Sequence, residues 1–244
     1  MNATTKIALV TGATRGIGYE TVRQLASAGV HVLLAGRDRA RAVEAALKLQ
    51  AEGLPVEAIV LDVTDSASVA AAAVEVERRH GRLDILINNA GIVLDDATQP
   101  RSAQTLQVWR ATFDTNLFGL IEVTQAFLPL LRASPAARIV NVSSLLGSLG
   151  VQSDPDSPLA GFGIPAYNVS KSAVNAWTVQ LAHELRGSAI KVNAVHPGYV
   201  RTDMNKGEGE LEVAQGAETS VAMALIDDQG PTGSFQYLGQ VLPW

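Results

Sequence analysis

The chain has 244 residues, of which 47% are hydrophobic and 18% are charged, so it can bury a large core and is not globally disordered. Its 19 Lys and Arg against 24 Asp and Glu give a formal net charge of −5, which argues against nucleic acid and anionic membranes as partners. The absence of cysteine excludes disulfides and thiol chemistry, and the four histidines show no metal-ligand spacing, so we expect no zinc enzyme and no metal site.

The amino-terminal segment and the apolar runs bear on where the protein resides. Only MNATT precedes the first predicted strand, and no apolar run approaches the ~18 residues of a membrane-spanning helix. A cleavable signal needs a basic start followed by an apolar stretch, and the chain shows neither. We therefore expect a cytoplasmic protein that does not bind membranes.

Short apolar runs alternate with longer helical segments along the chain. Most of these runs are continuous, which is typical of parallel strands covered on both faces. The predicted strands are residues 6–11, 31–35, 56–61, 83–88, 138–143, 190–195 and 234–238. The predicted helices are residues 16–28, 38–52, 66–80, 105–133, 165–186 and 208–225. This pattern predicts one α/β domain over residues 1–244, with a doubly wound parallel sheet of about seven strands and helices on both faces.

Polar residues and glycines mark several helix boundaries. Candidate helix starts are Asp38, Asp65 and Ser102, and candidate stops are Gly29, Gly53 and Gly81. Residues 152–163, rich in Pro, Gly, Ser and Asp, are predicted to form an exposed loop. Residues 205–209, with the sequence NKGEG, are either a mobile lid or an ordinary loop that enters the last helix.

The first predicted strand runs into Thr11-Gly12-Ala13-Thr14-Arg15-Gly16-Ile17-Gly18, a GxxxGxG loop that opens a helix. Such a loop lets backbone N–H groups approach a phosphate closely, and the helix N-terminus adds partial positive charge. A tight turn without a ligand is the alternative. The position of the loop, directly after the first strand of a βαβ unit, favours a dinucleotide site.

The residue after the second strand indicates which dinucleotide binds. NAD-binding proteins of this architecture carry an acidic residue there for the ribose 2′-OH, whereas this chain has Arg37. A guanidinium binds a 2′-phosphate in a bidentate way, and Arg15 in the glycine loop can close the same site. Two solvated arginines are the alternative, but cations at helix starts are unfavourable without a ligand. We therefore expect NADP(H) rather than NAD(H).

Further motifs occur in order along the chain and at fitting places in its βα pattern. They are TGATRGIG at 11–18, Asp62-Val63, NNAG at 88–91, Asn116, Ser143-Ser144, the YNVSK run at 167–171 and Pro197-Gly198. With this set the chain resembles the short-chain dehydrogenase/reductase family over nearly its whole length. Residues 192–204 and 230–244 resemble the carbonyl reductase branch of that family. The resemblance implies a three-layer Rossmann fold and hydride transfer with a nicotinamide cofactor.

The resemblance also implies which residues bind NADP(H). The pyrophosphate loop comprises Gly12, Thr14, Arg15, Gly16, Ile17 and Gly18, with Arg37 at the 2′-phosphate. The adenosine side comprises Asp62, Val63, Asn89, Ala90 and Gly91. The nicotinamide side comprises Tyr167, Lys171, Pro197, Gly198, Val200 and Thr202. Asn88 is implied to steady the central strand, and Asp62 as a turn residue or Thr202 as a helix cap remain alternatives.

Tyr167 and Lys171 offer acid–base chemistry without histidine or cysteine. Because they are four residues apart in a predicted helix, they share one face. An ammonium beside the phenol, together with the positive nicotinamide of the oxidised cofactor, is expected to lower the tyrosine pKa from ~10 toward neutrality. An isolated YxxxK is common on ordinary helices, so Ser144 and the glycine loop are what make it a candidate catalytic pair.

Roles for the remaining catalytic residues follow from the resemblance. It implies that Tyr167 donates a proton to a carbonyl oxygen, that Ser144 hydrogen-bonds that oxygen, and that Lys171 binds the nicotinamide ribose. Asn116 is implied to hold a water that links Lys171 to solvent. Asn116 lies mid-helix, where Asn is a poor helix former, so either a function or a helix kink explains it. Ser143 competes for the serine role, but alternation along a strand places it on the opposite face.

The spacing between two catalytic candidates departs from that of common short family members. Ser144 and Tyr167 are 23 positions apart, where about a dozen is usual in the family. The additional residues fall in 152–163, which we expect to flank the substrate cleft as an inserted loop. Candidate pocket residues, which alternatively anchor the loop, are Val93, Leu94, Leu159, Phe162, Ile164 and Tyr199. A homo-oligomer, either a dimer or a tetramer, is expected, and the insertion leaves its form open.

The sequence thus favours an NADPH-dependent carbonyl reductase with a small-molecule carbonyl or alcohol substrate, namely a small or medium apolar aldehyde or ketone. One alternative is a dehydrogenase of a single secondary alcohol of the steroid or sugar type. Another is an NADP-binding sensor without turnover, but a sensor has no need to keep Asn116, Ser144, Tyr167 and Lys171 together.

Overall fold

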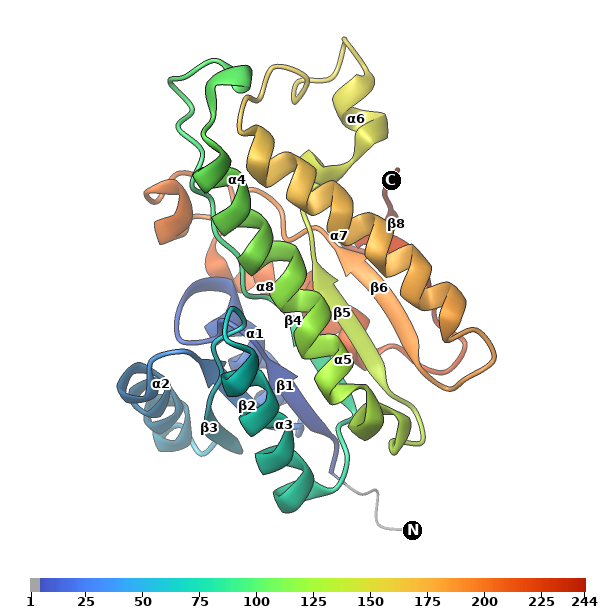
Figure 1. Ribbon diagram of the computed structural model, residues 1–244. Coiled ribbons are helices and arrows are strands. Elements are labelled where there is room, and N and C mark those ends of the chain that lie inside the picture. Colours follow the sequence, from blue (N-terminus) through green and yellow to red (C-terminus); the bar gives the residue numbers. More distant parts are fainter. Residues whose placement is uncertain (1–4) are drawn as a thin grey trace.

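One eight-stranded sheet runs through the protein in the order β3-β2-β1-β4-β5-β6-β7-β8 (Figure 1). The computed structural model describes residues 5–244. The strands are β1 Ile7–Val10, β2 His31–Gly36, β3 Val56–Val60, β4 Ile85–Asn88, β5 Arg138–Val142, β6 Lys191–Val195, β7 Ser234–Tyr237 and β8 Gln240–Val241. All neighbouring strands are parallel except β7 and β8, which pair antiparallel. The predicted parallel α/β sheet is confirmed.

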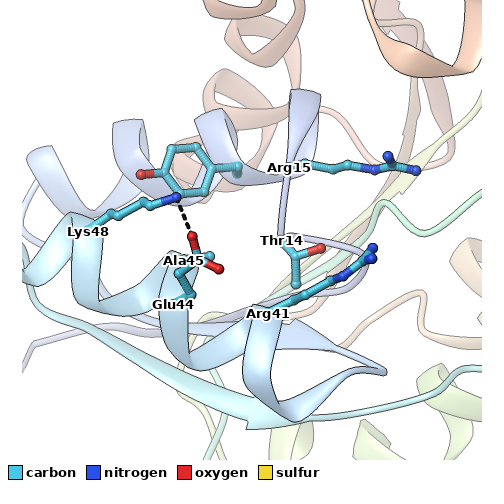
Figure 2. Close-up of a pocket in the computed structure, with 7 residues that line it drawn as sticks. Thr14, Arg15, Arg41, Glu44, Ala45 and Lys48 are labelled. Atoms are coloured by element: carbon cyan, nitrogen blue, oxygen red, sulfur yellow. Dashed lines mark hydrogen bonds and ion pairs between the residues drawn. The ribbon is translucent and has the colours of Figure 1, made fainter.

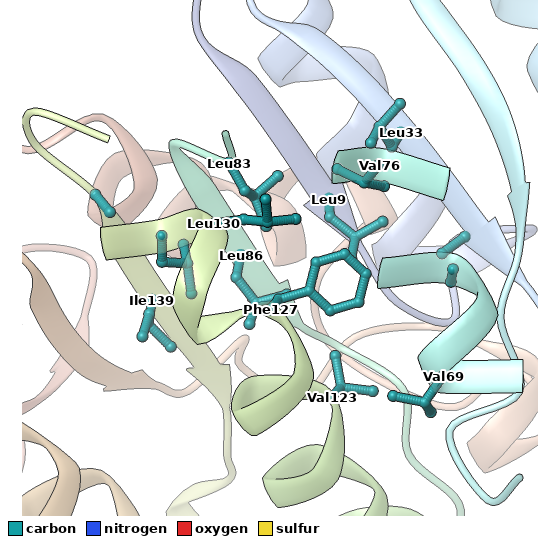
Figure 3. Packing of buried hydrophobic residues seen from close by; sticks show 14 of the residues in the cluster. Leu9, Leu33, Val69, Val76, Leu83, Leu86, Val123, Phe127, Leu130 and Ile139 are labelled. Carbon is teal, nitrogen blue, oxygen red and sulfur yellow. The ribbon is translucent and has the colours of Figure 1, made fainter. Parts of the chain in front are cut away.

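Helices cover both faces of this sheet. They are α1 Gly16–Ser27, α2 Arg39–Ala51, α3 Ser66–His80, α4 Leu106–Phe113, α5 Gly119–Arg132, α6 Leu149–Ser153, α7 Pro165–Glu184 and α8 Val213–Leu225. One apolar cluster joins α3, α5 and α7 to one face, and a second joins α1, α2 and α8 to the other (Figure 1). Figure 3 shows the fully buried ring of Phe127 from α5 between Leu9 and Val123 in the first cluster. These three layers are the predicted Rossmann architecture.

The strand predictions were accurate where the strands are buried. All seven predicted strands are present, and each observed end lies within one or two residues of the expected one. The eighth strand, β8, falls outside the prediction, because both of its residues are exposed and give no burial pattern.

The helix predictions needed more correction. The single helix predicted over 105–133 is a continuous rod in which a π-helical turn, η2 Asp114–Phe118, separates α4 from α5. The short helix α6 forms at the start of the predicted loop. The last helix begins at Val213 rather than at residue 208, because the preceding residues pair with the segment after β6 through the Val200–Leu211 bridge.

Most predicted helix boundaries are present. The carboxylates of Asp38 and Asp65 accept hydrogen bonds from backbone N–H groups in the first turns of α2 and α3. Ser102 was wrong as a helix start: it lies in the 3₁₀ turn η1 Arg101–Ala103, and the Thr105 side chain caps α4 instead. The three predicted stops have positive φ angles and are Gly29 at 83°, Gly53 at 79° and Gly81 at 68°.

The segment 152–163 is tied to its surroundings at several points. After α6 it continues in turns, and Nη2 of Arg101 donates to the carbonyl of Ala160 at 3.0 Å. Nδ2 of Asn168 on α7 donates to the carbonyl of Phe162 at 3.2 Å. The segment is therefore anchored both to α7 and to the connection after β4. Within residues 5–244, no helix has the length and apolar character that crossing a membrane requires.

The strand order places the candidate site. Connections leave β1 toward β2 on one side and β4 toward β5 on the other, so a crevice opens between β1 and β4 at their carboxyl ends. The glycine loop follows β1 and the NNAG motif follows β4, so both meet at this crevice. The carboxyl end of β5 and the amino-terminal part of α7 lie next to it (Figure 1).

Candidate active site

The end of β5 separates the roles of two adjacent serines. All five residues of β5 are buried, and the chain then turns through Ser143 and Ser144 into the 3₁₀ turn η3 Leu145–Gly147. The hydroxyl of Ser143 donates to the backbone carbonyl of Lys171 at 3.3 Å and so ties β5 to α7. The hydroxyl of Ser144 accepts from the Leu146 N–H at 3.2 Å and hydrogen-bonds Tyr167. The structure therefore brings Ser144, and not Ser143, to the tyrosine.

Tyr167 and Lys171 share the face of α7 that looks onto this strand end. Nζ of Lys171 lies 5.7 Å from the centre of the Tyr167 ring and donates to the carbonyl of Val142 at 2.7 Å. Helix α7 can approach so closely because η3 carries Gly147. A Cβ at that position would lie 2.6–2.7 Å from backbone and Cβ atoms of Lys171. The glycine therefore sets how near Lys171 lies to the end of β5.

Burial changes the pKa of both side chains. It raises the pKa of Tyr167 to about 12, although the hydrogen bond with Ser144 acts in the opposite direction. It lowers the pKa of Lys171 to about 8, because the ammonium is removed from water. The expected depression of the tyrosine pKa is thus not a property of the chain alone, since burial outweighs the hydrogen bond with Ser144. At pH 7 the phenol is protonated and the amine is largely charged.

Asn116 is fully buried inside the π-helical turn, where an extra residue widens the helix. Its Oδ1 accepts from the Ile92 N–H at 2.8 Å, and its Nδ2 donates to the Ile92 carbonyl and to Ser170 Oγ, both at 3.0 Å. Ser170 in turn donates to the Tyr167 carbonyl at 2.7 Å. The Asn116 amide therefore connects the loop after β4 to the helix of Tyr167, and both of its donor hydrogens are used.

Asp95 is a contributor that the sequence analysis missed. Its carboxylate accepts from the Ala166 N–H at 2.7 Å and from the Tyr167 N–H at 3.1 Å. Helix α7 begins with Pro165 after Ile164, whose side chain cannot cap, so these N–H groups need an acceptor from elsewhere. The acidic pair Asp95-Asp96, four residues after the NNAG motif, was the available signal, but only the fold shows that Asp95 reaches α7.

His196 is a second missed residue, and it supports the turn that carries Ser144. Its Nδ1 accepts from the Leu145 N–H at 3.2 Å, and its ring packs against Tyr237 with 5.0 Å between ring centres. Burial lowers the pKa of His196 to about 4, so the ring is neutral and can accept that hydrogen bond.

The glycine loop has the shape of a phosphate cradle. A Cβ at Gly12 would lie 2.8 Å from Ala90 Cα, and one at Gly18 would lie 2.4 Å from the Asn89 side-chain nitrogen. Asn89 Nδ2 donates to the carbonyls of Thr11 and Gly12 and so joins the loop to the end of β4. Gly16, by contrast, has a φ of 57° and no atom nearer than 4.0 Å to an added Cβ. Together with the start of α1, which no side chain caps, this opening fits a pyrophosphate.

Cationic side chains collect beside this loop. A pocket of about 440 Å³ lies between the loop and α2, and its lining includes Thr14, Arg15 and Arg41, while none of Ser144, Tyr167 and Lys171 lines it. Figure 2 shows Thr14 between Arg15 and Arg41, with both guanidinium groups directed to the same side of the pocket. Arg41 was missed by the sequence analysis, although it lies four residues after Arg37 in the RDRAR run.

Arg15 and Arg37 differ in their surroundings. Nη1 of Arg15 lies 2.7 Å from the carboxylate of Asp203, which comes from the connection after β6. Arg37 is exposed and belongs to no ion pair among residues 5–244. To contact a phosphate, the Arg15 guanidinium therefore has to break its ion pair with Asp203 or bind both acidic groups at once.

The other residues predicted to bind the cofactor have identifiable contacts within the fold. The carboxylate of Asp62 accepts from both the N–H and the hydroxyl of Thr64, so Asp62 acts as a turn residue. Val63 packs closely against Gly119 of α5, where a Cβ would lie 2.5 Å from the Val63 carbonyl oxygen. Asn88 donates to Thr124 and Asn141 inside the sheet, as expected for a structural residue. The remaining members are Ile17, Gly91, Pro197, Gly198, Val200 and Thr202, of which Val200 is buried and Thr202 caps η4 Asp203–Asn205.

The predicted pocket residues divide by burial. Leu94, Phe162 and Tyr199 are exposed to 46%, 47% and 46%, although large apolar side chains usually lie inside. Val93 and Leu159 are half-buried, and Ile164 is buried at the start of α7. The exposed three come from the loops after β4, before α7 and after β6. They provide apolar surface on the loops at the carboxyl edge of the sheet.

Comparison with known proteins places this geometry in a family. The sequence pattern of the family described as short chain dehydrogenase matches residues 6–212. The (+)-neomenthol dehydrogenase of Capsicum annuum is 34% identical, with 97% of this chain and 97% of that protein covered. The carbonyl reductase (NADPH) 1 of Mus musculus is also 34% identical, with 100% of both covered. The NADPH-bound carbonyl reductase from chicken fatty liver superposes with a TM-score of 0.86 at 30% identity, over 99% of this chain and 100% of that one.

The family match runs from the first strand past the segment that follows β6. It includes the glycine loop, the NNAG motif, Ser144 and the YNVSK run of α7. The resemblance stated from these motifs is thereby confirmed. The chain belongs to the short-chain dehydrogenase/reductase family, whose members are oxidoreductases of CH–OH and C=O groups.

Proposed function

We propose that this protein is an NADPH-dependent carbonyl reductase that reversibly reduces small or medium apolar aldehydes and ketones. The observation that carries the proposal is the meeting of Ser144, Tyr167 and Lys171 at the end of β5, next to the crevice that holds the glycine loop. The relatives with carbonyl reductase names support the same reaction class.

The cofactor would lie across the carboxyl edge of the sheet. Its pyrophosphate fits the opening at Gly16 and the uncapped start of α1, with Gly12 and Gly18 keeping the loop tight. We assign the 2′-phosphate to Arg37 and Arg15, and add Arg41 because it shares a pocket with Arg15. Adenine is placed at Asp62 and Val63, and the nicotinamide end at the segment from Pro197 to Thr202.

The chain then supplies proton transfer and polarisation. When bound, the cofactor supplies the hydride. Tyr167 is protonated at pH 7, because burial raises its pKa to about 12, and it donates its proton to the carbonyl oxygen. Ser144 donates a second hydrogen bond to that oxygen and stabilises the negative charge that develops there. Lys171 donates one ammonium N–H to the Val142 carbonyl, and its remaining N–H groups would donate to the nicotinamide ribose.

A water beside Asn116 would complete the proton path. A Cβ at Gly91 would lie 3.5 Å from Asn116 Oδ1 and 3.6 Å from Lys171 Nζ, so these two atoms border one small space. Both donor hydrogens of Asn116 are used by the protein, which leaves its oxygen as the group that accepts from a water. We assign Asn116 both this role and the positioning of the loop after β4.

The test is the oxidation of NADPH and NADH, followed by absorbance, with a panel of aromatic, aliphatic and dicarbonyl substrates. We expect turnover with NADPH and apolar carbonyls, and little with NADH or with charged carbonyls. Binding of NADPH without turnover of any carbonyl or alcohol would contradict the proposal and indicate a cofactor-binding sensor.

A dehydrogenase of a cyclic secondary alcohol is the second candidate. The observation that favours it is the full-length similarity to a (+)-neomenthol dehydrogenase, together with the exposed apolar side chains of Leu94, Phe162 and Tyr199. Oxidation of alicyclic terpenoid alcohols with NADP⁺ distinguishes the two. Higher kcat/KM for such an alcohol than for every carbonyl of the panel, including its own ketone, would establish this second function.

A further inference from the structure

Two histidines and a glutamate lie together near the amino-terminal ends of β2 and β3, whereas the candidate catalytic residues lie at the carboxyl ends of the strands. His31 is the first residue of β2, Glu57 is the second residue of β3, and His80 is the last residue of α3. The fold brings them together although they are 26 and 23 positions apart in sequence. One nitrogen of each imidazole and one oxygen of the carboxylate all lie within 4.8 Å of one another.

The sheet register explains why these side chains share one face. Leu33 on β2 is paired with Glu57 on β3, and His31 lies two residues before Leu33, so His31 and Glu57 point to the same side. That side carries α3, whose Val69 and Val76 pack in one cluster with Leu33. The last turn of α3 therefore delivers His80 directly over the two strand residues.

Two polar atoms in this cluster lack a hydrogen-bond partner. Nε2 of His31 and Nε2 of His80 are both buried and have no hydrogen-bond partner. Nε2 of His31 lies 2.8 Å from Oε1 of Glu57, a distance at which the two form an ion pair when the imidazole is protonated. The two imidazole rings are 5.5 Å apart between centres. Buried polar atoms without a partner are rare, and two of them in one cluster with a carboxylate point to a missing ligand.

We propose that His31, Glu57 and His80 bind a divalent transition-metal ion, with zinc as the best match. Two imidazole nitrogens and one carboxylate oxygen are ligands that zinc accepts in tetrahedral sites, whereas Mg²⁺ and Ca²⁺ prefer oxygen alone. Ligand atoms around a tetrahedral zinc lie roughly 3.4 Å apart, given bonds of about 2.1 Å. The three ligand atoms lie within 4.8 Å of one another, so small side-chain rotations would bring them to that spacing. All three residues are half-buried, which leaves the fourth position open to water.

Arg79 fixes the carboxylate without occupying the proposed metal position. Its guanidinium pairs with Oε2 of Glu57 and with Glu75, and so leaves Oε1 of Glu57 facing His31. Such a second partner orients a metal-ligating carboxylate. The positive charge of Arg79 also opposes a cation, so we expect the ion to be removed by a chelator rather than held permanently.

The proposed ion would act on stability and not on the reaction. It would fasten the carboxyl-terminal end of α3 to the edge formed by β2 and β3, and its ligands come from three separate elements. An ion that binds the folded chain alone raises the temperature of unfolding. The site lies outside the catalytic residues, so carbonyl reduction and zinc binding can each be present without the other.

The test uses the full-length chain without an affinity tag, freed of metal by a chelator and titrated with zinc chloride in a calorimeter. We expect one zinc ion per chain and a rise in the melting temperature, both reversed by chelator. His31→Gln and His80→Gln should each weaken zinc binding at least tenfold. His183→Gln is the matched control, because His183 is exposed on α7 and its Nδ1 lies 3.0 Å from the Arg186 guanidinium, away from this cluster.

X-ray absorption at the zinc edge of the wild-type complex gives a readout that does not depend on how the variants fold. We expect two imidazole ligands and a carboxylate oxygen. A spectrum without imidazole scattering would overturn the proposal. Equal zinc affinity in wild type, His31→Gln and His80→Gln would overturn it as well, and so would a loss of binding in His183→Gln as large as in those two variants.

Discussion

Burial acts in opposite senses on the two ionisable side chains at the centre of the site. It raises the pKa of Tyr167 to about 12 and lowers that of Lys171 to about 8. The first effect keeps the phenol protonated, which is the state that carbonyl reduction requires. The second effect means that the charged form of Lys171 is less favourable in the folded chain than in the unfolded chain, so Lys171 lowers the free energy of unfolding.

Lys171→Met should therefore stabilise the protein while removing activity. The difference between 10.5 and about 8 corresponds to about 3 kcal/mol, from which the lost hydrogen bond to Val142 takes about 1 kcal/mol. The folded pKa lies below the unfolded one, so the destabilisation by wild-type Lys171 is full below pH 8 and vanishes by about pH 10.5. Denaturant unfolding should show the variant more stable by about 1–2 kcal/mol at pH 7, with the gain fading as pH rises.

The control for this prediction is Lys48→Met, since Lys48 is exposed on α2 and its replacement should leave the stability almost unchanged. A Lys171→Met variant that is less stable than wild type at pH 7 would show that the ammonium stabilises the fold.

Substitution of Arg37 tests which of the two cofactors, NADPH or NADH, the protein prefers. Arg37→Asp should weaken NADPH binding by roughly 10–100-fold, because a charge-assisted contact to a phosphate contributes about 1.5–3 kcal/mol and the new carboxylate repels it. NADH binding should be unchanged or tighter. Fluorescence titration of both cofactors measures the ratio, with Arg78→Asp on the exposed side of α3 as the charge-matched control. Equal losses for NADPH and NADH would remove Arg37 from the 2′-phosphate site.

At the scale of elements, the start of α7 decides where Tyr167 lies. Pro165 opens the helix, and Asp95 accepts the next two N–H groups from a loop about 70 residues earlier. Asn116, in the π-helical turn before α5, holds the same loop to Ser170. Loop, π turn and helix therefore form one unit, and the tyrosine is positioned from its backbone as well as from its side chain.

Asp95→Ala should lower kcat more than it changes the dissociation constant of NADPH. The substitution leaves two N–H groups of α7 without an acceptor, so we also expect a stability loss of about 1–2 kcal/mol. Asp95→Asn keeps one acceptor oxygen and should restore part of both. Steady-state kinetics with binding titrations separate the two quantities. Asp96→Ala is the neighbouring control, because Asp96 accepts only within its own loop; an equal fall in kcat there would argue against a specific role for Asp95.

At the scale of the whole molecule, the sequence predicted what depends on burial and on local spacing. Continuous apolar runs located seven strands, and the YNVSK run placed Tyr167 and Lys171 on one helical face. Each of these patterns is local, because the residues that form it lie within a few positions of one another in the chain. Contacts between distant segments gave no such signal. The Arg15–Asp203 pair joins residues 188 positions apart, and Asp95 lies 72 positions from the N–H of Tyr167 that it accepts. The cluster of His31, Glu57 and His80 likewise exists only once β2, β3 and α3 have packed.

The proposed function depends on hydride transfer from NADPH to a carbonyl carbon at the Ser144–Tyr167–Lys171 site. Mass spectrometry of the alcohol formed with NADPH that carries deuterium at both hydrogen positions of the nicotinamide C4 detects this transfer, with Tyr167→Phe run beside the wild type. We predict one deuterium on the carbinol carbon of the wild-type product. For Tyr167→Phe we predict almost no product despite NADPH binding close to that of wild type. Unlabelled alcohol from the wild type would rule out direct hydride transfer, and labelled alcohol formed equally fast by Tyr167→Phe would rule out Tyr167 as the proton donor.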